Sequence, residues 1–158
     1  MNVASITELK KELIKLEPSR LVEVCLRLAK YKIDNKELLT YLLFESDNEI
    51  AYVSAIKHKI DEQIKNLNRS NIYYLKKGLR KILRQLDKYI RYSANKETET
   101  ELRIYFCQKM IDAKISIKRS KVLFNLYEGQ IKKIKNSMGK LHEDLQYDYG
   151  LRVEEIQI

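Results

Sequence analysis

Apolar residues recur along nearly the whole chain at the spacing of α-helices, that is, at positions i, i+3, i+4 and i+7. Three sequences match the capping box that begins many helices: Ser5 with Glu8, Asp34 with Glu37, and Ser46 with Glu49. The pattern predicts five successive helices over about residues 6–16, 19–32, 36–45, 46–67 and 70–92.

The second and third of these helices are apolar on nearly every side. The polar residues of the second, Glu23, Arg27 and Lys30, form one narrow stripe, and the third leaves little besides Glu37 and Thr40 to face water. Helices with so little polar surface are typical of the interior of a fold. We therefore expect both helices to be buried.

The segment 98–138 carries two apolar stripes in its first half and one in its second half. It is one long helix or two helices broken near residues 116–120, and periodicity does not distinguish between these alternatives. Gly139 and Gly150 are plausible residues to follow a helix end, and they bracket a short last helix. Residues 151–158 are predicted to form a C-terminal tail.

Composition supports an all-α protein with one domain over residues 1–150. The 158 residues include only 4 glycines and 1 proline, fewer than the turns of an all-β protein of this size require. The longest apolar run is less than half of the ~20 residues that cross a bilayer, so no membrane insertion is expected. Cys25 and Cys107 lie in apolar helical patterns, which favours buried thiols and a cytoplasmic location.

Two stretches of the chain share a weak internal similarity. The first is Leu21-x-x-x-Cys25-Leu26-Arg27 followed by Glu37-Leu38-x-x-Tyr41, and the second is Leu75-x-x-Gly78-Leu79-Arg80 followed by Glu101-Leu102-x-x-Tyr105. With paired helices and a doubly covered interior, the chain resembles the HEAT and armadillo families of helical repeat proteins over about residues 6–112. We expect a compact array of about six to eight helices, either a HEAT-like superhelix or an irregular bundle.

The positive charge of the chain is concentrated in one segment. The formal net charge is +9, and residues 57–92 alone hold 11 basic and 3 acidic side chains, a net charge of +8. At ~100° per residue, six cations of the helix 70–92 fall on one face, opposite its apolar residues, and two tyrosines lie at the edge of that face. The candidate site residues are therefore Tyr73, Tyr74, Lys77, Arg80, Lys81, Arg84, Lys88 and Arg91.

This basic face has two interpretations. It is a solvated surface, neutralised in part by acidic residues of a neighbouring helix, or it binds an acidic protein or the phosphates of a nucleic acid. Six aligned cations beside two tyrosines favour nucleic acid within the second interpretation, although no base-reading motif is present. The alternative function is that of a structural or oligomer-forming helical protein.

Catalysis is not indicated by the sequence. His58 and His142 stand far apart and in no metal-binding spacing, and the four glycines are isolated, so neither a metal site nor a phosphate loop is predicted. Gly78, in mid-helix, suggests the close approach of another helix. We expect a non-catalytic interaction module without a metal or cofactor; an enzyme with an unrecognised, dispersed site is the least favoured alternative.

Overall fold

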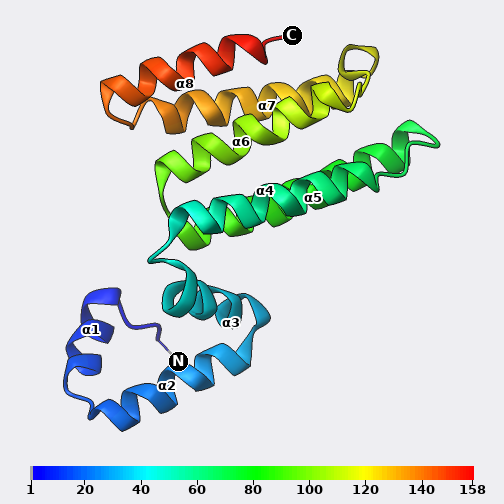
Figure 1. Ribbon diagram of the computed structural model, residues 1–158. Coiled ribbons are helices and arrows are strands. Elements are labelled where there is room, and N and C mark those ends of the chain that lie inside the picture. The colour runs from blue at the N-terminus through cyan, green and yellow to red at the C-terminus, as the bar shows by residue number, and fades with distance from the viewer. Residues whose placement is uncertain (1) are drawn as a thin grey trace. The chain divides into compact units, whose positions relative to one another are not determined.

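The computed structural model describes residues 2–158, and this part of the chain is all-α, as predicted, with eight α-helices and no strand (Figure 1). The chain divides into two compact units, residues 1–44 and 45–158, where the sequence analysis treated residues 1–150 as one domain. The helices are α1 (Ile6–Ile14), α2 (Pro18–Tyr31), α3 (Ile33–Thr40), α4 (Glu49–Lys65), α5 (Ile72–Ser93), α6 (Lys96–Asp112), α7 (Lys121–Met138) and α8 (Glu143–Glu155). A π-helical turn, Tyr41–Glu45, follows α3, and a 3₁₀ turn, Ile117–Arg119, precedes α7.

The first unit is a small group of helices in which α2 packs against α3. The predicted capping box at the start of α1 is present, with the Ser5 side chain accepting a hydrogen bond from the Glu8 amide. No residue of α1, α2 or α3 is buried, so the expectation that the second and third helices lie inside the fold is wrong. The physical reason is that three short helices offer too little surface to cover one another's apolar sides.

The second unit is built around α6, which packs against α4, α5, α7 and α8. Its buried residues lie around about 240° of the helix circumference, more than a single apolar stripe would cover: Thr98, Thr100, Leu102, Arg103, Ile104, Phe106, Cys107 and Met110. Helix α7, in contrast, buries one face only. The core of the unit is therefore the surface of α6, and the other four helices are placed by their contacts with it.

The start of α4 differs from the sequence-based prediction, and the structure decides between the two alternatives for the segment 98–138. Asn48, two residues after the predicted cap Ser46, caps α4 and accepts a hydrogen bond from the Ala51 amide. The segment 98–138 is two helices separated by residues 113–120, within which Lys114 has a left-handed backbone with φ of 52°. Neither boundary carries a glycine or proline, which is why the pattern of residue types alone did not resolve them.

The predicted tail at residues 151–158 is wrong for most of its length. Gly150 does not end a helix but lies inside α8, which continues to Glu155. Val153 and Ile156 are buried, and the Tyr127 hydroxyl of α7 donates a 2.6 Å hydrogen bond to the Ile156 carbonyl. The apolar contacts of these two residues outweigh the low helix propensity of Gly150, so the end of the chain completes the core of this unit.

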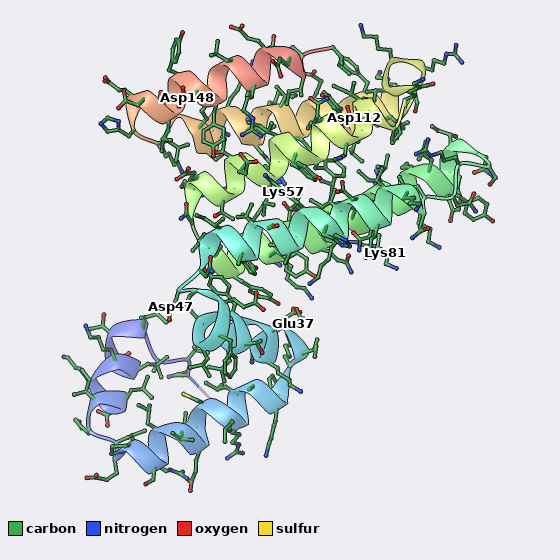
Figure 2. The ribbon with its side chains drawn as sticks, viewed as in Figure 1. Glu37, Asp47, Lys57, Lys81, Asp112 and Asp148 are labelled. Carbon is green, nitrogen blue, oxygen red and sulfur yellow. The ribbon has the colours of Figure 1, made fainter. Side chains whose placement is uncertain are left out.

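Glu101 of α6 joins α4 and α8 to the central helix. Its carboxylate accepts hydrogen bonds from Lys57 of α4 and Arg152 of α8, and its side chain is only 15% exposed. Burial alone would raise the pKa of this carboxyl, but the hydrogen bonds and charges of Arg152 and Lys57 outweigh burial and lower the pKa of Glu101 to about 2. Figure 2 shows Lys57 between the ribbons of α4 and α6.

The lowered pKa of Glu101 predicts a loss of stability in acid. Because the unfolded carboxyl takes up its proton near pH 4.5, the stabilisation is complete above that pH and is lost as the pH falls from about 4.5 to about 2. The free energy of unfolding at stake is at most about 3 kcal/mol. Urea denaturation across this pH range should show the loss, and Glu101→Gln should reduce it. An equal pH dependence in Glu101→Gln and in the exposed control Glu154→Gln would contradict this account.

Candidate anion-binding face

Helix α5 is held to the second unit by one apolar face. The Asn71 side chain caps the helix by accepting a 3.0 Å hydrogen bond from the Tyr74 amide, and Ala94, in a left-handed conformation with φ of 54°, follows its last residue. The buried residues are Leu79, Ile82, Leu83, Leu86 and Ile90. Because these residues face α4 and α6, the basic side of α5 is turned outwards.

Gly78 permits a close contact on the buried side of α5, as the sequence suggested. A Cβ atom at this position would lie 2.5 Å from Cδ2 of Leu67. Leu67 belongs to the turn between α4 and α5, so the neighbour is not the body of another helix. The glycine therefore makes room for the Leu67 side chain, which a larger residue at this position would displace.

The predicted cations lie on an open surface. Lys77, Arg80, Lys81, Arg84 and Arg91 are exposed, and their side chains form no hydrogen bond or ion pair with any other residue that the structure describes. Lys88, the sixth cation, is half-buried and does have a partner. We call these six residues, with Tyr73 and Tyr74, the basic face. Five of its six cations thus have no hydrogen-bond or ion-pair partner among the described residues.

Tyr73 and Tyr74 lie at the start of α5, next to the first cation of the row. Their rings meet edge to face, with centroids 5.3 Å apart and planes at 77°. Lys76 adds a cation–π contact, its Nζ lying 5.8 Å from the centre of the Tyr73 ring. Both tyrosines are exposed, so their rings are accessible to a ligand.

Asp87 is the only acidic residue of α5, and its charge does little to neutralise the basic face. Its carboxylate accepts a 2.8 Å hydrogen bond from Arg103 of α6 and lies 3.4 Å from Nζ of Lys133 of α7. An acidic side chain that is already shared by two cations neutralises little of the neighbouring row. Arg103 and Lys133 are not among the residues predicted from the sequence, because their link to α5 depends on helix packing.

Arg103 is a buried cation with a complete set of partners. Its side chain is 5% exposed, and its guanidinium donates hydrogen bonds to Asp87, to Glu99 (3.1 Å) and to the side-chain oxygen of Gln130 (2.8 Å). These partners belong to α5, α6 and α7. Arg103 therefore holds α5 and α7 on one side of α6. Glu101 lies two residues earlier, about 200° away around the helix, and holds α4 and α8 on the other side.

A groove of about 680 Å³ lies between α5 and α7, beside the basic face. Cations stand on both of its sides, and apolar side chains line it between them. Its lining consists of Arg80, Leu83, Arg84 and Asp87 from α5, and Val122, Asn125, Leu126, Gly129, Gln130 and Lys133 from α7. Arg80 and Arg84 belong both to this groove, called the α5–α7 groove below, and to the basic face.

Other chemistries find little support in the described residues. No group of three or more histidine, cysteine or acidic side chains within residues 2–158 is placed to hold a metal ion. His58 and His142 are exposed. Cys25 is half-buried, whereas the sequence predicted a buried thiol. Burial raises the pKa of the Cys107 thiol to about 12, which makes this thiol unreactive. Among the described helices, none has the length and apolar content needed to cross a membrane.

Comparison of the chain with protein-family models, with curated proteins and with solved structures finds no match. The site is accordingly defined by its geometry and charge.

The Arg103 contacts predict a large effect of removing this one charge. Arg103→Met leaves Asp87, Glu99 and Gln130 without their shared donor, and we expect a loss of about 3 kcal/mol in the free energy of unfolding. Lys133→Met, which removes the outer and more exposed cation beside Asp87, should cost less than about 1 kcal/mol. Urea denaturation measures both, and equal losses would refute the central role of Arg103.

Proposed function

We propose that the protein is a non-catalytic helical interaction module that binds the phosphates of nucleic acid along the basic face of α5. The observation that carries this proposal is the row of five exposed cations without partners in the described chain. Like charges one turn apart on a helix repel each other by a few tenths of a kcal/mol per pair. A polyanion removes this repulsion and releases its own counterions when it binds.

The dimensions of the row suit a nucleic-acid strand. Lys77 and Arg91 are fourteen residues apart, which corresponds to about 21 Å along the helix axis. Over that length a strand in a duplex presents about six phosphates, at ~3.4 Å of axis per phosphate. Long lysine and arginine side chains reach several of these from one straight helix. The exposed rings of Tyr73 and Tyr74 offer stacking or sugar contacts at one end.

The basic face favours a phosphate chain over a lipid surface. The apolar side of α5 is buried against α4 and α6, so it is not available to insert between lipids. Contacts to phosphates do not distinguish one base from another, and the protein has no base-reading motif. The binding that we propose is therefore independent of the base sequence of the nucleic acid. A cytoplasmic location and the resemblance to HEAT and armadillo repeats stay predictions that accompany this proposal.

The proposal is tested by removing cations that belong to the basic face but do not line the α5–α7 groove. Lys77→Gln with Lys81→Gln should weaken binding to short DNA and RNA oligonucleotides, single- and double-stranded, and should lower the slope of log affinity against log salt by about 2. Fluorescence anisotropy at several salt concentrations measures both quantities. Figure 2 shows Lys81 projecting away from the body of its unit.

The matched control is Lys135→Gln with Lys140→Gln, which makes the same change in net charge at exposed positions in and just after α7. We expect this control to keep the affinity and salt slope of the unchanged protein. If both double variants lose affinity equally, only net charge matters and the basic face is not the site. If the unchanged protein binds none of the oligonucleotides at low salt, the proposal is wrong, whatever the basic face does with proteins.

A further inference from the structure

The outer face of α8 carries the charge opposite to that of the basic face. Helix α8 has five acidic residues and one basic residue, and all five acidic residues are exposed. On a helical projection they lie on both sides of two exposed apolar side chains, Tyr147 (70% exposed) and Leu151 (50% exposed). The acidic residues are Glu143, Asp144, Asp148, Glu154 and Glu155. We call these seven residues the acidic face.

The inner side of α8 is already used, so the acidic face is what this helix presents to a partner. Arg152, the only cation of α8, bonds Glu101 of α6, while Tyr149 and Val153 are buried. Glu143, Asp148 and Glu154 form no hydrogen bond or ion pair with the rest of the described chain. Their charges are therefore uncompensated, as are those of Arg80 and Arg84 in the α5–α7 groove.

The α5–α7 groove has the features that such a helix needs in a binding site. Val122 (41% exposed) and Leu126 lie one turn apart on α7, the same spacing as Tyr147 and Leu151 on α8. Arg80 and Arg84 stand on the α5 side of the groove and Lys133 on the α7 side. An amphipathic helix laid in a groove, with apolar residues inwards and opposite charges at the rims, is a common mode of recognition.

Gly129 gives independent support for an occupant of the groove. This glycine lies in the middle of α7 and lines the groove, and a Cβ at its position would meet no atom within 4 Å. Packing within the protein therefore does not require a glycine, although glycine in mid-helix costs ~1 kcal/mol relative to alanine. A missing side chain at this place lets the backbone of an incoming helix approach closely.

The acidic face cannot reach the α5–α7 groove of its own molecule. Arg103 fixes α5 and α7 on one side of α6, and Glu101 fixes α8 on the other side. In Figure 2, Asp148 on α8 and Lys81 on α5 lie at opposite edges of the unit. Two complementary surfaces on opposite sides of one chain meet only between two copies.

We propose that the acidic face of α8 docks in the α5–α7 groove of a second copy of this chain. Tyr147 and Leu151 contact Val122 and Leu126, and the flanking carboxylates pair with Arg80, Arg84 and Lys133. The contact joins different surfaces of the two copies, so the pair keeps one free groove and one free acidic face, and association continues into a ring or a chain. Because much of the attraction is between exposed charges, association weakens steeply as salt increases.

This inference does not rest on the proposed function, but the two share Arg80 and Arg84. A docked α8 covers the α7 side of the basic face, so a bound oligonucleotide and a docked second copy compete for these two arginines. Reversing the charge of the acidic face should abolish self-association and leave oligonucleotide binding in place. The failure of either proposal is thus visible without the other.

The experiment uses two variants of the full chain, each of which breaks one half of the contact. The groove variant is Arg80→Glu with Arg84→Glu, and the acidic-face variant is Asp148→Lys with Glu154→Lys; all four positions are exposed. Sedimentation velocity at low salt, over a range of protein concentrations, should show the unchanged protein forming species larger than a dimer. Each variant alone should associate at least about tenfold more weakly. Circular dichroism checks that both remain helical.

The decisive measurement is a mixture of the two variants. The groove variant keeps an intact acidic face and the acidic-face variant keeps an intact groove, so together they form one correct contact and stop at a 1:1 dimer. This dimer should dissociate at high salt, and Lys135→Glu with Lys140→Glu should associate as the unchanged protein does. The inference is overturned if the unchanged protein stays monomeric at every concentration, if either variant alone associates normally, or if the mixture forms no dimer.

Discussion

The burial of Arg103 is the constraint on which the second unit depends. A helix that is buried over most of its circumference, as α6 is, must either lack charged residues in its buried part or supply each with partners from the helices around it, because an unpaired buried charge costs several kcal/mol. Arg103 takes its partners from α5, α6 and α7, and Glu101 takes its partners from α4 and α8. Apolar contacts supply most of the stabilisation, whereas these two residues determine which helices lie on which side of α6.

The same constraint explains why the basic face stays unpaired. Asp87, the one carboxylate that α5 contains, is turned towards α6 by its bond to Arg103 and is shared with Lys133. Two acidic residues of α6 are also engaged in contacts near the core: Glu99 with Arg103 and Lys96, and Glu101 with Lys57 and Arg152. Burial opposes ionisation of Glu99, yet Lys96 and Arg103 keep the pKa of Glu99 below its usual value. The carboxylates of α8 lie on the far side of the central helix, and among them Glu143, Asp148 and Glu154 have no hydrogen-bond or ion-pair partner in the described chain.

The sequence predicts those parts of this arrangement that depend on interactions between residues close together along the chain. It does not predict those that depend on contacts between helices distant in the sequence. The amphipathic pattern of α5 is local, and it predicted the bounds of the helix to within two residues. The interruption between α6 and α7 was only partly predicted, because a left-handed Lys114 carries no signal in the sequence. The burial expected for α2 and α3, and the tail expected after Gly150, were wrong because both depend on which other helices are present. The α5–α7 groove and Lys133 were beyond prediction for the same reason.

The formal charge of +9 hides the separation of charge that matters most here. A uniformly basic surface attracts polyanions and keeps copies of the protein apart. This chain instead places a row of unpaired cations on one side of α6 and a cluster of carboxylates on the other, each next to exposed apolar side chains. Two copies therefore repel each other at long range through their net charge and attract each other when basic and acidic sides meet. Salt screens both effects, but the attraction acts at contact distance and has an apolar component that salt does not weaken.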